Sequence, residues 1–152
     1  MKNIKCLVIS IAIPILVGLI GSLLGNSSMG FDMINKPNFS PPGYIFPIVW
    51  TILYILMGIS SYIVYNSKSS KKDEAIVIYG LQLLVNMLWT FFFFNLKWYL
   101  FSFIWIILLI VLVSVMIYRF VKINKLSGYL QIPYLVWLVF ASILNLSIYI
   151  LN

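Results

Sequence analysis

Long apolar segments alternate with short polar links along almost the whole chain. The apolar segments cover residues 4–24, 43–65, 75–118 and 126–151, and the polar links cover residues 26–42, 66–74 and 119–125. A helix of ~20 residues is long enough to cross the ~30 Å hydrocarbon core of a bilayer. The segments are too long and too uniformly apolar for barrel strands, which would alternate. The pattern therefore predicts membrane-spanning helices.

The tract 75–118 is too long for a single span. At ~1.5 Å per residue, one helix of this length would extend ~66 Å, about twice the hydrocarbon core. Asn95 and Lys97 interrupt the tract, so we predict two helices, 75–96 and 98–118, joined by a tight turn. With 4–24, 43–65 and 126–151, the prediction is an all-α, integral membrane bundle of five transmembrane helices, forming one domain over residues 1–152.

The first apolar segment follows Lys2 and Lys5, as the apolar part of a signal peptide would. It is longer than the roughly 7–15 residues usual for that part of a signal peptide. We therefore expect the segment to be retained as a membrane helix.

Composition supports a lipid environment. Of the 152 residues, 63% are hydrophobic and 9% are charged, and the mean hydropathy is +1.08. A soluble domain would be roughly half apolar and about a quarter charged. An aqueous fold of this size has no way to bury so much apolar surface, so the lipid bilayer is an expected partner of the chain.

Basic residues gather at the ends of the apolar segments. The N-terminus and the second and fourth links share one side of the membrane, and they carry Lys2, Lys5, Lys68, Lys71, Lys72, Arg119, Lys122 and Lys125. The opposite side carries only Lys36 and Lys97. The positive-inside rule then predicts a cytoplasmic N-terminus and an external C-terminus. No single basic face forms, so we expect no nucleic-acid partner.

Several kinds of chemistry are excluded by missing residue types. The chain has no histidine and one cysteine, Cys6, so we expect no metal site and no required cofactor. No ionisable residue lies inside a span away from its ends, which argues against an ion-coupled transporter and against a hydrolase. Aromatic, amide and hydroxyl side chains remain, and they favour a pocket for a large, flat, mostly apolar molecule.

Three sequence blocks point to a known family. The first is KPNFSPPGYIFPIVWTILYILMG at residues 36–58, the second is LQLLVNMLWTFFFF at 81–94, and the third is LQIPYLVWLVFASILNLSIYILN at 130–152. Their order, with the five predicted spans, resembles the TspO/MBR family. This is the group of the translocator protein, or peripheral-type benzodiazepine receptor, called tryptophan-rich sensory proteins in bacteria. The resemblance covers essentially the whole chain.

The resemblance implies a membrane receptor or sensor, usually a homodimer, with a ligand cavity under the first loop. Members of the family bind porphyrins, isoquinoline or benzodiazepine drugs, and in animals cholesterol. We therefore expect a porphyrin such as protoporphyrin IX, or another hydrophobic small molecule, as ligand, and a role in tetrapyrrole metabolism or stress response in a bacterial cytoplasmic membrane. Two alternatives stay open, a light-dependent porphyrin-degrading enzyme that uses cavity tryptophans and a passive carrier of tetrapyrrole or lipid.

Site residues follow from the matching positions. Trp50, Trp89 and Trp137 match family tryptophans and lie too deep in their spans for an interfacial belt. Core packing remains an alternative for these indoles, and an interhelical hydrogen bond remains one for Asn86. The expected catalytic residues, if porphyrin degradation occurs, are Trp50 and Trp137. The expected ligand-binding residues are Phe31, Phe46, Trp50, Tyr54, Asn86, Trp89, Trp137, Ala141 and Leu144.

The first long link carries a second expectation. Pro41 and Pro42 would start the second helix sharply, and Pro47 would bend it one turn later. The stiff loop 26–42 would then act as a lid, with Phe31 or Phe39 closing on the ligand. The alternative is that the prolines only fix the loop. No basic residue follows Tyr149, so the family's animal cholesterol motif is not supported here.

Overall fold

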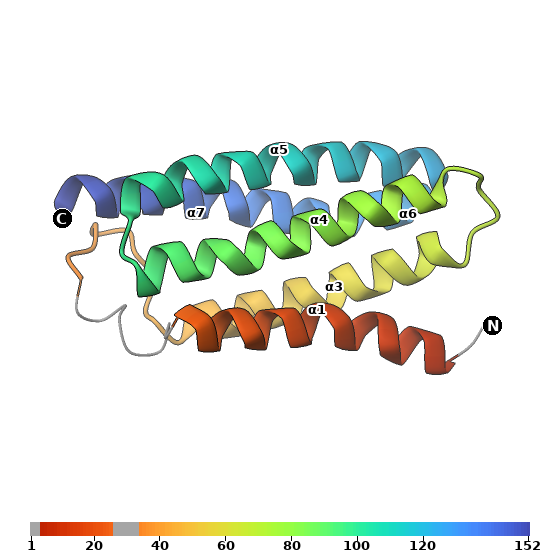
Figure 1. Cartoon of the computed structure of the whole chain (residues 1–152), viewed down its shortest axis with the longest axis horizontal. Coiled ribbons are helices and arrows are strands. Elements are labelled where there is room, and N and C mark those ends of the chain that lie inside the picture. Colours follow the sequence, from red (N-terminus) through yellow and green to blue (C-terminus); the bar gives the residue numbers. More distant parts are fainter. Residues whose placement is uncertain (1–3, 26–33) are drawn as a thin grey trace.

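The structure is a computed structural model that describes residues 4–25 and 34–152. All regular elements of the described chain are helices, and the long ones form a roughly aligned bundle (Figure 1). Its elements are α1 (Ile4–Gly25), α3 (Ile45–Tyr65), α4 (Lys72–Thr90), the π-helix η2 (Phe91–Asn95), α5 (Tyr99–Ile123), α6 (Lys125–Tyr129) and α7 (Ile132–Leu151).

Within the described residues, five helical stretches are long and apolar enough to cross a membrane, counting α4 with η2 and α6 with α7. The predicted all-α fold with five membrane spans is therefore confirmed, and the chain is an integral membrane protein. The name basic end is used for the end of the bundle that holds the start of α1, residues 66–71 and the end of α5. The opposite end, with residues 34–44, η2 and the end of α7, is the loop end (Figure 1).

Several helices begin or end away from the predicted positions. α4 begins at Lys72 instead of residue 75, and α5 continues to Ile123 instead of residue 118. Long basic side chains can reach water while their backbone stays helical. The helix therefore extends into the polar link, which makes the link shorter and leaves the apolar membrane span unchanged. α3 begins at Ile45, which places Pro47 in the first helical turn. The N–H groups of that turn have no partner within the helix in any case, so a bend at Pro47 is not required.

Glycines allow the first helix to pack closely against its neighbours. α1 packs against α3 and α4, α4 packs against α5, and α5 packs against α7. A Cβ placed on Gly58 of α3 would lie 2.4 Å from the Ile11 Cα of α1. A Cβ on Gly25 of α1 would lie 2.8 Å from the Thr90 carbonyl oxygen of α4. Gly21 of α1 lies beside Met87 of α4. The Gly21–Gly25 face therefore packs inside this chain, as close helix approaches in membranes require.

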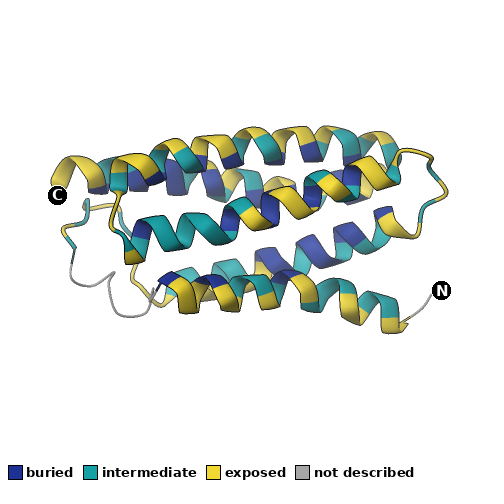
Figure 2. Ribbon diagram, in the orientation of Figure 1, coloured by how far each residue is buried: buried dark blue, intermediate teal, exposed yellow. Residues whose placement is uncertain are grey.

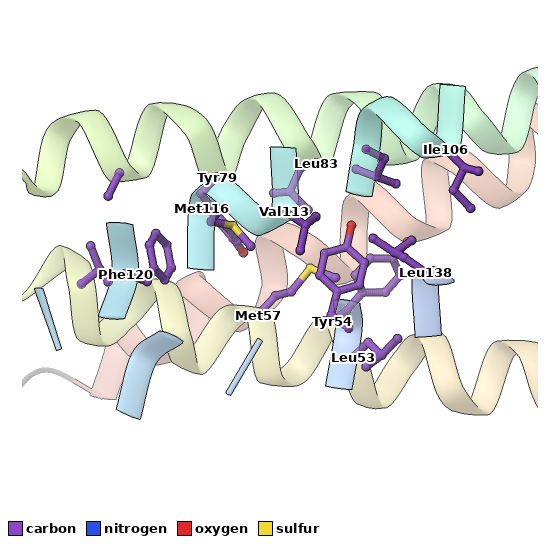
Figure 3. Packing of buried hydrophobic residues seen from close by; sticks show 14 of the residues in the cluster. Leu53, Tyr54, Met57, Tyr79, Leu83, Ile106, Val113, Met116, Phe120 and Leu138 are labelled. Atoms are coloured by element: carbon purple, nitrogen blue, oxygen red, sulfur yellow. The ribbon is translucent and has the colours of Figure 1, made fainter. Parts of the chain in front are cut away.

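The core is densely filled in the middle of the bundle and toward the basic end. Met57, Val64, Met116 and Phe120 have no exposed surface, and Figure 3 shows Met57, Met116 and Phe120 in one cluster with Leu83 and other buried side chains. The outer faces carry exposed apolar residues (Figure 2), which suits a surface covered by lipid. The most tightly filled part of the core therefore lies away from the loop end.

The turn between the third and fourth spans contains a feature that the sequence did not predict. Four phenylalanines and Asn95 form a π-helical turn that extends α4, and Lys97 follows with a φ of 56°. The Asn95 Nδ2 donates to the Leu24 carbonyl oxygen over 2.8 Å. This bond satisfies one of the free carbonyls at the end of α1 and connects it to the turn.

Candidate functional site

An aromatic cavity lies between α1, α3, α4 with η2, and α7, toward the loop end. Its volume is about 650 Å³, within the range usual for small-molecule sites. The wall consists of Ile15, Gly18, Leu19, Ser22, Gly43, Tyr44, Phe46, Pro47, Trp50, Thr51, Tyr54, Trp89, Thr90, Phe93, Phe94, Trp137, Ala141, Leu144 and Asn145.

Helix α3 supplies one wall through residues at helical spacing. Trp50 and Tyr54 are one turn apart, and their rings stack with centroids 5.6 Å apart. The Tyr134 ring of α7 meets Trp50 edge to face at 6.1 Å. Trp50 is thus fixed between two tyrosines in geometries that aromatic pairs favour.

Helix α7 supplies a second wall through Trp137, Ala141, Leu144 and Asn145, which lie on one helical face. The Trp137 ring packs between Phe46 at 5.8 Å and Phe140 at 5.2 Å. Within the described part of the chain, its Nε1 is buried without a hydrogen-bond partner. Packing alone therefore holds this indole.

The third tryptophan of the wall is fixed by hydrogen bonds. Trp89 Nε1 donates to the Asn145 Oδ1 over 3.0 Å, and Asn145 Nδ2 donates to the Tyr99 carbonyl oxygen over 2.8 Å. The Trp89 ring also stacks on Phe93 of η2 at 5.1 Å. Trp89 is consequently a more rigid part of the wall than Trp137.

A buried polar network supports the wall from behind Tyr54. The Tyr54 hydroxyl donates to the Asn86 Oδ1 over 3.1 Å, and Asn86 Nδ2 donates to the Tyr134 hydroxyl over 2.8 Å. Tyr134 in turn donates to the Gln82 Oε1 over 2.6 Å. Gln82 and Asn86 are buried, so these bonds satisfy amides that would be costly to leave unpaired in lipid.

The structure brings most of the expected binding residues together. On the cavity wall lie Phe46, Trp50, Tyr54, Trp89, Trp137, Ala141 and Leu144. Asn86 lies behind the wall, bonded to Tyr54 and Tyr134, and Phe31 lies outside the described residues.

Only part of the expected lid can be described. Residues 26–33 of that loop fall outside the described ranges. Phe39 is half exposed and packs against Phe140 at 6.2 Å, and it is not among the wall residues, whereas Gly43 and Tyr44 are. Asn152 Nδ2 donates to the Asn35 carbonyl oxygen over 2.9 Å, so the described end of the loop is bonded to the end of α7.

Sequence reasoning missed the wall that α1 contributes. Ile15, Gly18, Leu19 and Ser22 face the cavity, but α1 is apolar on all sides and no periodicity distinguishes one face. The small residues Gly18 and Ser22, one turn apart, were the available signal. A Cβ on Gly18 would lie 2.3 Å from the Tyr54 ring, so this glycine makes room for the wall of α3.

The chemistry of the cavity is that of ring faces and aliphatic groups. Its indole, amide and hydroxyl groups are largely engaged with the protein, as for Trp89, Asn145 and Thr51, whose hydroxyl donates to the Pro47 carbonyl oxygen over 2.7 Å. Among the described residues, no cluster of His, Cys, Asp or Glu could hold a metal ion. The site therefore suits a flat, apolar ligand that stacks on aromatic rings.

Fold and site together define an integral membrane helical bundle with an aromatic cavity. The chain matches the TspO/MBR family over residues 10–151, and it belongs to that family. It is 36% identical to the tryptophan-rich protein TspO of Archaeoglobus fulgidus, over 99% of each chain. It is 33% identical to the protein of that name from Chlorobaculum tepidum, over 99% of this chain and 98% of the relative. The translocator protein of Sus scrofa is 28% identical over 90% of this chain and 84% of its own.

Proposed function

We propose that the protein is a membrane receptor that binds a porphyrin, or a hydrophobic molecule of similar shape, in the aromatic cavity. The observation that carries this proposal is the 650 Å³ cavity whose wall includes Trp50, Trp89 and Trp137 together with several phenylalanine rings. A tetrapyrrole is flat and mostly apolar, so ring stacking would supply much of its binding free energy. The absence of histidine from the sequence favours a metal-free porphyrin such as protoporphyrin IX over an iron porphyrin.

Orientation and assembly complete the proposal. The basic end faces the cytoplasm, in agreement with the positive-inside rule, and the cavity opens toward the external half of the membrane. The protein acts as a homodimer, as family members usually do. Ligand occupancy would be signalled to tetrapyrrole metabolism or to a stress response, without any covalent change in the protein.

A second function is light-dependent porphyrin degradation. The observation that favours it is that two indoles, Trp50 and Trp137, border the same cavity. Light would excite the bound porphyrin and oxygen would oxidise it, with an adjacent indole carrying the electron between them and returning to its reduced state. Product formation that requires light, and that Trp50→Phe or Trp137→Phe abolishes while binding persists, distinguishes this enzyme from a receptor.

The binding proposal is tested by titrating purified protein with protoporphyrin IX in the dark and following porphyrin absorption. We expect saturable binding at micromolar or lower concentration, and a Kd about threefold to tenfold higher in the Trp50→Phe/Trp137→Phe variant, because a smaller phenyl ring keeps only part of each aromatic contact of about 0.5–1.5 kcal/mol. Trp98→Phe is the matched control, since Trp98 is 52% exposed and is not part of the wall.

A steric variant gives an independent test of the same cavity. Ala141 lies on the wall and is 6% exposed, so Ala141→Leu should occupy ligand space and raise the Kd about tenfold or more. Val139→Leu adds apolar volume on the outer face of α7, where residue 139 is 45% exposed, and should leave the Kd unchanged. Equal affinities in all variants, or absorption changes that never saturate, mean that porphyrin partitions into detergent and that the site assignment is wrong.

A further inference from the structure

A second cavity is lined by residues of the α3–α4 link and the last turns of α5, and these segments lie at the basic end of the bundle (Figure 1). Its volume is about 330 Å³, and its lining consists of Ser69, Lys71, Tyr118, Arg119, Lys122 and Ile123. Two elements form it, the link between α3 and α4 and the last turns of α5. We call it the basic pocket.

The charges around the basic pocket do not cancel. Arg119 Nη1 forms an ion pair with the Glu74 Oε1 over 2.6 Å. Within the described residues, neither Lys71 nor Lys122 has a carboxylate partner, and the Lys122 ammonium lies over the Tyr118 ring, 5.2 Å from its centroid. Two ammonium groups in a concave site attract an anion more strongly than dispersed surface charges do, since the walls exclude part of the solvent.

Neutral donors accompany these charges. The Ser69 Oγ accepts the Lys71 backbone N–H over 3.1 Å, which leaves the Ser69 O–H proton for another acceptor. The Tyr118 side chain is 64% exposed at the rim. Ammonium and hydroxyl donors converging on one small volume are typical of a phosphate site.

An apolar strip on α5 leads from the basic pocket toward the membrane interior. Val111, Val115, Tyr118 and Lys122 follow one another in steps of three or four residues and so share one face of the helix. Val111 is 54% exposed and Val115 is 39% exposed. The pocket is at the end of a membrane span, at the level of lipid headgroups, and the strip below it faces the acyl chains.

We propose that the basic pocket binds the phosphate of an anionic phospholipid. Lys71 and Lys122 contact the phosphate, Ser69 and Tyr118 donate to it, and an acyl chain lies along the Val111–Val115 strip. A free phosphate would use the same donors, but it would make no use of the strip that continues from the pocket. The site does not depend on the function proposed for the aromatic cavity.

The test is native mass spectrometry of the purified full chain in detergent with equal amounts of dioleoylphosphatidylglycerol and dioleoylphosphatidylcholine. We expect phosphatidylglycerol to be retained about tenfold more than phosphatidylcholine by the wild type. In Lys71→Gln/Lys122→Gln this preference should fall about fivefold or more. Lys68→Gln/Lys125→Gln is the matched control, because it removes the same charge from exposed positions of the same end that do not line the pocket.

Three outcomes overturn the proposal. An equal loss in both double variants means that diffuse charge, and not the pocket, attracts the lipid. The absence of a phosphatidylglycerol preference in the wild type means that no headgroup site exists. Displacement of the lipid by millimolar inorganic phosphate identifies a site for free anions. If the Lys71→Gln/Lys122→Gln variant melts at a lower temperature than the wild type, the single variant Lys122→Glu replaces it, with Lys125→Glu as its control.

Discussion

Tyr54 has two separate functions within one side chain. Its ring stacks on Trp50 at the cavity wall, and its hydroxyl donates to Asn86 behind the wall. Asn86 also binds Tyr134, whose ring meets the other edge of Trp50. The hydrogen bonds of one amide therefore set the positions of both rings that surround Trp50.

Tyr54→Phe should separate these two functions. The ring remains, so we expect the porphyrin Kd to change less than twofold. The Asn86 Oδ1 loses its donor in a buried site, which should lower the free energy of unfolding by about 0.5–1.5 kcal/mol. Thermal melting in detergent and the dark titration measure the two effects. A large loss of affinity without a loss of stability would mean that the Tyr54 hydroxyl contacts the ligand directly.

Sequence patterns identified the rings of the site better than its amides. Trp50, Trp89 and Trp137 occupy positions that the family motifs mark, and all of them lie on the wall. Spacing alone could not distinguish an amide that faces a ligand from one that faces a tyrosine. Asn86 was expected to contact ligand and lies behind the wall, whereas Asn145 was not among the expected binding residues and lies on it.

At the scale of helices, glycines determine how closely α1 approaches the others. Gly58 of α3 faces the α1 backbone, with space for hydrogen only. Gly58→Ala should force the two helices apart and lower the free energy of unfolding by about 1–3 kcal/mol. Gly80→Ala is the control, because nothing lies within 4 Å of a Cβ at Gly80. It should leave stability within about 1 kcal/mol of the wild type, on the stabilising side.

Melting of the two alanine variants in one detergent decides this point. A destabilised Gly58→Ala beside an unaffected Gly80→Ala supports the close approach of α1 and α3. Equal melting temperatures for both variants would mean that α1 is packed more loosely than the structure indicates.

Helix existence could be predicted from the sequence, whereas irregular segments could not. The lengths of the apolar segments were enough to predict the five spans, because a span in lipid must satisfy its backbone hydrogen-bonding groups within its own helix. The π-helical turn at Phe91–Asn95 makes a tertiary contact, the hydrogen bond from Asn95 to the Leu24 carbonyl oxygen. No local pattern records a partner 71 positions away.

At the scale of the whole molecule, the most tightly filled part of the core and the aromatic cavity lie in different halves of the bundle. The fully buried residues Met57, Val64, Met116 and Phe120 belong to the middle and the basic end, and the aromatic cavity belongs to the loop end. The packed middle of the bundle lies between the aromatic cavity and the basic end.

Membrane orientation is tested with single cysteines in a Cys6→Ser background. Asn38→Cys places an exposed thiol at the loop end, and Ser70→Cys places one at the basic end. We expect a membrane-impermeant maleimide added to intact cells to label only Asn38→Cys, and both variants to be labelled after lysis. Labelling of Ser70→Cys alone in intact cells would reverse the proposed orientation.

The most direct test of ligand binding in the aromatic cavity is fluorine NMR of protein labelled with 5-fluorotryptophan, titrated with protoporphyrin IX in the dark. The chain has five tryptophans, so single Trp→Phe variants assign every signal. Trp50, Trp89 and Trp137 line the cavity, whereas Trp98 and Trp105 do not. We predict that ring currents of the bound porphyrin shift the signals of the first three residues in a saturable manner and leave those of Trp98 and Trp105 unchanged. Shifts confined to Trp98 and Trp105, or equal at all five positions, would contradict binding in this cavity.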